Sequence, residues 1–175
     1  MTQVRKAIAS FVFCCGFAFA HVGAPGVCLG QQTLFIVRHA ERKDQSADSP
    51  LSPAGEARAK TLARMLRDAK VTAIYSSEFQ RTIQTAQPLA DQLHLEVKKE
   101  FKGDTDDFAK LLADRHPNGV ILVVGHSNTV PDLLRSLKHT PSTPISISDM
   151  EFDNLFVVAT VKDAPPTVAR LRYGD

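Results

Sequence analysis

The chain has 175 residues, with 21 Lys and Arg against 19 Asp and Glu, so its formal net charge is only +2. It contains no Trp, two Tyr and no stripe of basic residues, a composition that excludes a dedicated nucleic-acid-binding protein. About 145 residues follow the first thirty, which is enough for one domain around one sizeable core.

The N-terminus is typical of a secretory signal peptide. Arg5 and Lys6 precede the mostly apolar stretch 7–20, which ends in Ala-Phe-Ala. This stretch is too short to span a bilayer comfortably, and a segment rich in glycine follows it. We therefore expect a signal peptide over 1–20, with cleavage as late as residue 30 as an alternative, and a mature domain over 31–175. The expected location is periplasmic or secreted, with no stable membrane anchor after signal removal.

Either cleavage site excludes an intramolecular disulfide in the mature domain. Cleavage after Ala20 leaves Cys28 alone, and cleavage after residue 30 leaves no cysteine. Loss of Arg5 and Lys6 leaves 19 basic against 19 acidic residues, so the mature chain is neutral overall. We expect a domain that is held together by its core alone.

The first elements of the domain alternate between strand and helix. The apolar run 34–37 ends at a polar pair and predicts a buried strand. Ser52 and Pro53 are suited to the N-cap and the first residue of a helix. Residues 71–75 predict a second strand, and apolar residues at helical spacing from about residue 79 predict the next helix.

The same alternation continues to the end of the chain. Pro88 should kink or restart the helix in which it lies, and Asp104 or Thr105 can cap the following helix. The apolar run 120–125 predicts a strand, and a helix with a regular apolar face follows it. Two last strands, 155–161 and 168–172, flank an Ala-Pro-Pro turn and are expected to be antiparallel. This pattern predicts a three-layer α/β/α domain with a mainly parallel central sheet and antiparallel C-terminal strands.

Polar side chains follow three of these strands at their carboxyl ends. Arg38 and His39 come directly after the first strand, Ser76 and Ser77 follow the second, and His126 follows the run 120–125. The carboxyl ends of parallel strands meet at one edge of a sheet, where ligands bind. Histidines beside arginines indicate a pocket for an anionic group, of which phosphate fits best.

Three motifs in this order resemble those of the histidine phosphatase superfamily, which is phosphoglycerate mutase-like. They are Val-Arg-His-Ala at 37–40, Tyr-Ser-Ser-Glu-Phe-Gln-Arg-Thr-Ile-Gln-Thr-Ala at 75–86, and Val-Gly-His-Ser at 124–127. The resemblance covers nearly the whole mature chain. The small size of the mature domain is similar to that of the bacterial phosphohistidine phosphatases.

The resemblance implies a role for each of four side chains. His39 would attack phosphorus and carry a covalent phosphohistidine, while Arg38 and Arg81 would hold the phosphoryl oxygens. His126 would donate to the transferring group and stabilise its charge. No metal and no other cofactor is expected, because these cations supply the charge compensation. Arg42 fits the extended Arg-His-x-x-Arg spacing and is a further candidate for phosphate binding, the alternative being a solvated loop charge.

The general acid that would protonate the leaving group is the weak point of the resemblance. The mutase branch uses a Glu near a Trp, which this chain lacks, and the acid phosphatase branch uses an Asp where this chain has Ser127. Glu41, Asp104 and Asp106 are candidate substitutes, although aspartates at such positions more often cap helices. Without a strong acid the enzyme should favour good leaving groups, such as aryl esters and phosphohistidine, over alkyl phosphates.

The leading interpretation is therefore a phosphatase that hydrolyses phosphate monoesters or phosphohistidine through His39. Its partner would be a phosphorylated small molecule or a phosphoprotein substrate. Two alternatives stay open: a non-catalytic phosphoryl-binding protein that kept the arginines, and a phosphoglycerate mutase-type phosphotransferase. The short segment 93–119 leaves little room for the extra loops with which a mutase holds a sugar acid.

Overall fold

The computed structural model describes residues 31–138, 144–161 and 164–174. The expected signal peptide and both of its alternative cleavage sites lie outside these described residues. Within them, no helix is long and apolar enough to cross a membrane.

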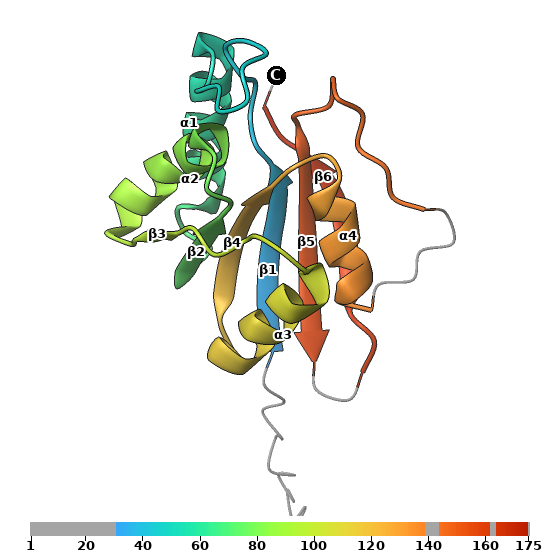
Figure 1. Cartoon of the computed structure of the whole chain (residues 1–175). Coiled ribbons are helices and arrows are strands. Elements are labelled where there is room, and N and C mark those ends of the chain that lie inside the picture. The colour runs from blue at the N-terminus through green and yellow to red at the C-terminus, as the bar shows by residue number, and fades with distance from the viewer. Residues whose placement is uncertain (1–30, 139–143, 162–163, 175) are drawn as a thin grey trace, which may run out of the picture.

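Six strands form one sheet in the part of the chain that the structure describes (Figure 1). In chain order they are β1 (Gln31–Arg38), β2 (Ala73–Ser76), β3 (Val97–Lys98), β4 (Val120–Gly125), β5 (Asn154–Val161) and β6 (Thr167–Arg172). Their order across the sheet is β3-β2-β4-β1-β5-β6. The first four strands in this spatial order are parallel, and β5 and β6 are antiparallel to their neighbours. The predicted sheet and its antiparallel C-terminal strands are confirmed.

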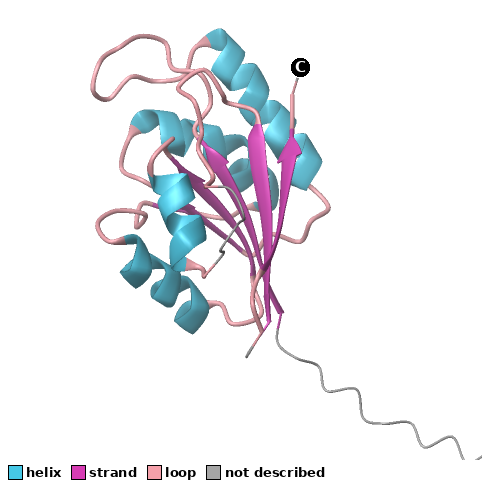
Figure 2. Ribbon diagram, turned by 90° about the vertical axis from the view of Figure 1, so that its right-hand side faces the viewer, coloured by secondary structure: helices cyan, strands magenta, loops and turns pink. Residues whose placement is uncertain are grey.

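Helices cover both faces of this sheet, as the two views in Figures 1 and 2 show. They are α1 (Pro53–Leu66), α2 (Gln80–Leu93), α3 (Thr105–Arg115) and α4 (Thr129–Ser136). Helices α1 and α2 pack together on one face, and α3 and α4 pack together on the other. The predicted three-layer α/β/α class is therefore confirmed.

Strand periodicity divides the core into two layers. Leu34 and Ile36 of β1 point to the layer under α3 and α4, whereas Val37 points to the layer under α1 and α2. The central β4 alternates in the same way, because successive side chains of a strand leave opposite faces. Both faces of β1 and β4 are buried, which is why these strands read as continuous apolar runs.

Local signals in the sequence place the helix ends. The Ser52 side chain accepts a hydrogen bond from the Gly55 N–H at 3.1 Å, and Asp104 accepts one from the Asp106 N–H at 2.7 Å. Pro88, by contrast, lies inside a continuous α2, so the expectation that it would restart the helix was wrong. Packing of α2 against α1 and the sheet outweighs the one backbone hydrogen bond that Pro88 cannot donate.

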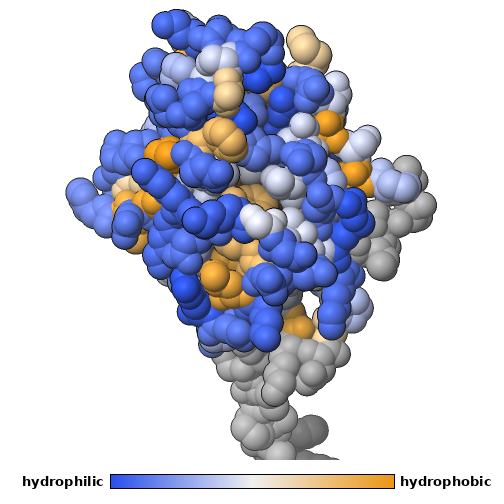
Figure 3. All heavy atoms as spheres, in the orientation of Figure 1, coloured by the Kyte–Doolittle hydropathy of each residue, from blue (hydrophilic) through white to orange (hydrophobic). Residues whose placement is uncertain are grey.

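Strand register determines which loops meet at the carboxyl edge of the parallel strands. Arg38 pairs with Gly125 between β1 and β4, and Ser76 pairs with Val124 between β2 and β4. Val37 pairs with Leu155 of the antiparallel β5, so the segment that precedes β5 passes the same edge. The space-filling view shows a mostly hydrophilic face on which hydrophobic residues form small separate groups (Figure 3).

Candidate active site

His39 and His126 lie side by side because their strands are neighbours in register. The backbone N–H of His39 donates to the Gly125 carbonyl oxygen at 2.9 Å and extends the pairing of β1 with β4 by one residue. The centroids of the two imidazole rings are 5.3 Å apart, and the rings meet edge to face. The two strand-end histidines predicted from the sequence therefore share one site.

The surroundings of His39 leave one ring nitrogen ready to act as a nucleophile. Its side chain is buried, and Nδ1 lies 2.8 Å from the carbonyl oxygen of Ala40. A carbonyl oxygen only accepts, so Nδ1 carries the hydrogen and Nε2 keeps its lone pair. Burial and, to a smaller extent, the charges of Arg38 and Arg81 lower the pKa of His39 to about 3, although the hydrogen bond to Ala40 acts in the opposite direction. The imidazole is thus neutral near pH 7.

A chain of hydroxyl groups orients His126. Its Nε2 lies 3.0 Å from Ser77 Oγ, which lies 2.8 Å from Thr82 Oγ1, and Thr82 donates to the Phe79 carbonyl oxygen at 2.8 Å. Since Thr82 uses its hydrogen on that carbonyl, Ser77 donates to Thr82 and accepts from Nε2–H of the neutral ring. Burial and the charge of Arg81 lower the pKa of His126 to about 4.

Arg38 is a buried cation that is held on several sides. Its Nη1 donates to the carbonyl oxygens of Ser148 at 2.7 Å and of Glu151 at 3.2 Å. Its guanidinium carbon lies 4.3 Å from the centre of the Phe152 ring. Burial lowers the pKa of Arg38, and Nε is a buried donor with no partner among the described residues. A buried orphan donor is costly, and a phosphoryl oxygen would satisfy it.

Arg81 and Arg42 complete a cationic group around the histidines. Arg81 Nη1 donates to the Ala47 carbonyl oxygen at 2.8 Å, and its Nε is a second buried donor without a partner in the described part of the chain. Burial and the charge of Arg42 lower the pKa of Arg81, and the charge of Arg42 also lowers that of Arg38. Arg42 is exposed and donates to Gln45, and its effect on both pKa values places it within electrostatic reach of Arg38 and Arg81.

Gly125 allows the turn into His126 to pass against the core. A Cβ atom at this position would lie 2.6 Å from Cε1 of Phe101 and 2.8 Å from Oγ1 of Thr129. Phe101 is buried and stacked on Phe108 with ring centroids 4.5 Å apart, so it has little freedom to move aside. Residue 125 must therefore lack a side chain for the backbone to approach this closely.

The segment before β5 supplies site residues that sequence reasoning missed. Asp149 Oδ1 lies 3.6 Å from Arg38 Nη2 and accepts a hydrogen bond from Ser127 Oγ at 3.1 Å. Phe152 packs against His39 with ring centroids 6.1 Å apart. A signal for this segment was present: a strand antiparallel to β1 must begin at the edge where β1 ends, so the residues before it must pass the site.

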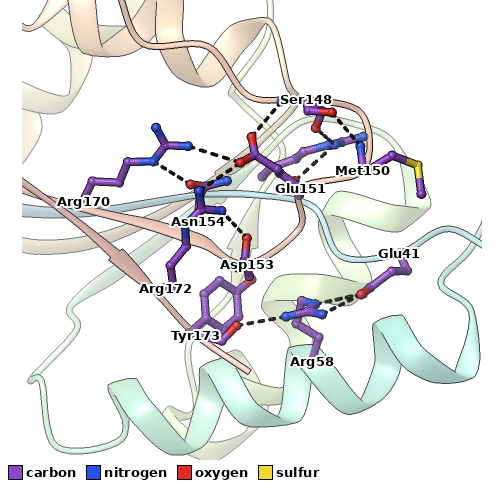
Figure 4. Close-up of polar contacts among 11 residues, drawn as sticks. Glu41, Arg58, Ser148, Met150, Glu151, Asp153, Asn154, Arg170, Arg172 and Tyr173 are labelled. Atoms are coloured by element: carbon purple, nitrogen blue, oxygen red, sulfur yellow. Dashed lines mark hydrogen bonds and ion pairs between the residues drawn. The ribbon is translucent and has the colours of Figure 1, made fainter. Parts of the chain in front are cut away.

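A network of ion pairs holds this segment in place, as Figure 4 shows. Glu151 accepts from the Ser148 N–H at 2.9 Å and pairs with Arg172 at 2.9 Å and with Arg170 at 3.7 Å. Arg172 also pairs with Asp153 at 2.6 Å. The two arginines of β6 thereby fix the backbone that presents its carbonyl oxygens to Arg38.

The three candidate general acids do not gather around the histidines. Glu41 is held by Arg58, whose Nε donates to both carboxylate oxygens at 2.9 and 3.0 Å (Figure 4). Asp104 caps α3, and Asp106 is exposed in the first turn of that helix. Each of these carboxylates therefore has a structural partner or place, and none contacts His39 or His126 in the described part of the chain.

The arrangement combines a neutral nucleophile with a concentrated positive charge. Two guanidinium groups each offer an unpartnered buried Nε–H, and the lone pair of His39 Nε2 is free to attack. Such a site suits transfer of a phosphoryl group to nitrogen. Within the described residues, no group of three or more His, Cys, Asp or Glu side chains could hold a metal ion.

Comparison with known proteins points to one family. The family model of the histidine phosphatase superfamily (branch 1) matches residues 34–102, which contain His39 and both Arg38 and Arg81. His126 lies beyond the matched residues, so its place in the site rests on the geometry. No curated protein sequence matches the chain.

Several solved structures share the fold. The protein histidine phosphatase SixA complexed with tungstate is 21% identical with a TM-score of 0.67, covering 80% of this chain and 96% of that one. A mycobacterial glucosyl-3-phosphoglycerate phosphatase with inorganic phosphate is 16% identical with a TM-score of 0.61, covering 82% and 97%. A phosphoserine phosphatase mutant from Entamoeba histolytica, in complex with phosphoserine, is 17% identical with a TM-score of 0.56, covering 79% and 95%. At these identities the likeness shows the fold.

Proposed function

We propose that this chain is a phosphoric monoester hydrolase of the histidine phosphatase type, which works through a covalent phosphohistidine on His39. The observation that carries this proposal is the environment of His39. Its hydrogen-bonded Nδ1–H directs the lone pair to Nε2, and burial keeps the ring neutral far below pH 7. A neutral imidazole is the nucleophilic form.

The proposed reaction has two displacements at phosphorus. In the first, His39 Nε2 forms a bond to phosphorus while the bond from phosphorus to the leaving group breaks, and the leaving group takes the electron pair. In the second, water attacks phosphorus, the bond to Nε2 breaks, and inorganic phosphate and a proton are released. The two displacements add up to hydrolysis of the substrate, and water is the only co-reactant that they consume.

The arginines and His126 stabilise the charge on the transferring group. Nε of Arg38 and Nε of Arg81 are buried donors that await acceptors, and phosphoryl oxygens are the acceptors that a guanidinium matches best. His126 is held by Ser77, so its ring is positioned before substrate arrives. Binding of a phosphate dianion favours the protonated form of His126, which would then donate to the phosphoryl group.

Good leaving groups are the proposed substrates of this site. Glu41 is occupied by Arg58, and Asp104 and Asp106 belong to the start of α3, so these three acids are poorly placed to protonate a departing oxygen. A phenolate or an imidazole departs without strong acid assistance, whereas an alkoxide does not. The substrate is thus proposed to be an aryl phosphate or phosphohistidine, on a small molecule or a protein. The matched structures include a protein histidine phosphatase, which is consistent with this class.

Turnover of a chromogenic aryl phosphate by the mature chain and by His39→Ala tests the proposal. We expect steady turnover and an acid-labile phosphoryl label on the wild-type chain, and loss of at least about a thousandfold in kcat with no label on the variant. Phosphate binding without turnover or label in the wild-type chain would contradict the proposal and favour a non-catalytic phosphoryl-binding protein. Transfer of the label to a phosphoglycerate rather than to water would instead favour a mutase-type phosphotransferase.

Export of the chain is a separate part of the proposal. The basic start and apolar stretch of residues 1–20 support a signal peptide and a periplasmic or secreted location. Expression of the full chain with fractionation, followed by the intact mass of the periplasmic material, would test both export and the cleavage site. A full-length mass confined to the cytoplasmic fraction would contradict it.

A further inference from the structure

Two partly exposed phenylalanine rings lie beside the two halves of the site. Phe152 packs against the His39 ring with centroids 6.1 Å apart, and Phe79 packs edge to face against the His126 ring with centroids 5.4 Å apart. Both side chains are only partly buried, so each keeps some surface open to solvent or a ligand.

Each ring also supports one of the phosphate-binding arginines. The guanidinium carbon of Arg38 lies 4.3 Å from the Phe152 ring centre, and that of Arg81 lies 4.4 Å from the Phe79 ring centre. Each phenylalanine therefore contacts one histidine and one arginine of the site. The two contacts come from unrelated segments, the N-cap of α2 and the segment before β5.

Neither ring belongs to the hydrophobic core. The buried clusters on the two faces of the sheet, and the partly buried residues packed on them, do not include Phe79 or Phe152. Met150, on the segment of Phe152, is 85% exposed and adds apolar surface near the same edge. Aromatic side chains that sit outside the core and against catalytic groups are placed to contact the substrate.

We propose that Phe79 and Phe152, hereafter the aromatic pair, select substrates in which the phosphoryl group is bonded directly to a planar ring, either a phenol oxygen or an imidazole nitrogen. This inference rests on the proposed function and names the residues that recognise the substrate class proposed there. A phosphoryl group between His39 and His126 has an aromatic ring on the side of either histidine. A planar leaving group bonded to that phosphorus lies within reach of stacking or edge-to-face contact.

Such leaving groups depart without help from the three candidate acids, which the structure holds in other roles. When His39 Nε2 bonds to phosphorus, a phenolate departs with the electron pair of the broken P–O bond and takes its proton from water. A phosphorylated imidazole that is protonated on its other nitrogen departs as the neutral ring when the P–N bond breaks. Neither departure requires a carboxylic acid beside the oxygen or nitrogen that leaves.

Two phosphate esters with leaving groups of nearly equal acidity separate ring recognition from leaving-group chemistry. The probes are phenyl phosphate and hexafluoroisopropyl phosphate, whose fluorinated alcohol is about as acidic as phenol. Phosphoimidazole is the third probe and distinguishes an imidazole source from a phenol source. The measured quantity is the ratio of kcat/KM for each ring substrate to that for the fluoroalkyl ester, with the Ki of inorganic phosphate measured in parallel.

For the wild-type chain we expect both ratios to exceed one. Phe79→Leu and Phe152→Leu should each lower them by about three- to tenfold, because an aromatic contact is replaced by an aliphatic one. The control is Phe35→Leu, which changes a partly buried phenylalanine of β1 that packs on the core under α1 and α2. It should leave the ratios unchanged. The Ki of phosphate should stay within about twofold in both site variants, since the arginines remain.

Three results would overturn the inference. A wild-type ratio near one for both ring substrates would show that the leaving ring is not recognised. Unchanged ratios in both site variants would do the same. The third result is a site variant in which kcat/KM falls by the same factor for all three probes and Ki for phosphate rises by that factor. The aromatic pair would then only hold the arginines in place. Absence of turnover of every probe, with no phosphoryl label on His39, would instead overturn the proposed function on which the inference stands. If only one ring substrate has a ratio above one and Phe79→Leu or Phe152→Leu lowers that ratio, the inference is supported and the source is identified, because the reactivity of the broken bond is the same in every variant.

Discussion

At the scale of single residues, the site depends on how protons and charges are distributed among a few side chains. His39 has one nitrogen committed to the carbonyl of Ala40, and His126 has one committed to Ser77. Arg38 donates from Nη1 to two carbonyl oxygens, and its Nη2 lies near the carboxylate of Asp149. Among the described residues its Nε has no partner and is therefore the donor available to a ligand. In the free protein the donors of the proposed phosphate clamp are therefore already oriented.

We expect the carboxylate of Asp149 to weaken the binding of phosphate to Arg38. Its carboxylate lies 3.6 Å from Arg38 Nη2, and its side chain is 88% exposed. Asp149→Asn should lower the Ki of inorganic phosphate about two- to fivefold, because one negative charge near the incoming anion is removed and solvent screens the rest.

Asp68→Asn is a closely matched control for this measurement. Asp68 is also 88% exposed and pairs with Arg67 at 3.5 Å, but it follows α1 and leads toward the start of β2, at the other end of the sheet. The Ki for phosphate should not change in that variant. An equal change in both variants would mean that net charge, and not the position of Asp149, affects binding.

At the scale of elements, two backbone approaches set the distance between the site and the helices. Gly125 brings the end of β4 against Phe101 and Thr129. Gly55 in α1 brings that helix against the backbone of Glu41, where a Cβ would clash with the carbonyl oxygen. Neither glycine has a positive φ, so its backbone conformation does not require glycine. Each is needed because a side chain would prevent the close contact.

Gly125→Ala should destabilise the fold by about 1–3 kcal/mol, because the added methyl group overpacks a region that is already filled. The clash is with the side chains of Phe101 and Thr129, which lie next to the turn into His126. Urea denaturation would measure the loss, and kcat should fall as His126 is displaced. Phe101→Leu removes the ring carbon that clashes, so the double variant should regain part of the loss. Strictly additive losses would argue against this contact as the cause.

At the scale of the whole molecule, the two histidines make stability depend on pH. Their pKa values lie at about 3 and about 4 in the folded chain, below the ordinary value of 6.5. Above pH 6.5 both are neutral in the folded and unfolded states alike. As the pH falls below 6.5, only the unfolded chain takes up these protons, so stability is lost progressively down to the folded pKa values.

Each histidine should thus add a slope of up to about 1.4 kcal/mol per pH unit between about pH 6.5 and pH 4. Urea denaturation of His39→Asn/His126→Asn at several pH values should give a flatter loss of stability than the wild-type chain. His94→Asn is the control: this exposed histidine ends α2 in the left-handed conformation, which Asn tolerates. An equal slope in the wild-type chain and the double variant would contradict the prediction.

Much of this protein can be predicted from its sequence, because the relevant signals are local. Apolar runs and helix caps indicate the alternating elements, and the polar pairs after the strands identify Arg38, His39 and His126 as site residues. Parallel strands bring their carboxyl ends together as a geometrical necessity, so these residues could be expected to meet. A restart of the helix at Pro88 was predicted wrongly, because tertiary packing outweighed a local breaker.

Only the tertiary structure shows which side chains surround the histidines from distant parts of the chain. The positions of Phe152 and Asp149 depend on the antiparallel register of β5 with β1, and the burial that lowers the pKa of His39 depends on every layer around it. Contacts between segments more than a hundred residues apart, such as Arg38 with Ser148, leave no periodic trace in the sequence. The local pattern determines the proposed nucleophile and the arginines around it, and long-range packing determines the ionisation of His39 and the side chains that the proposed leaving group would contact.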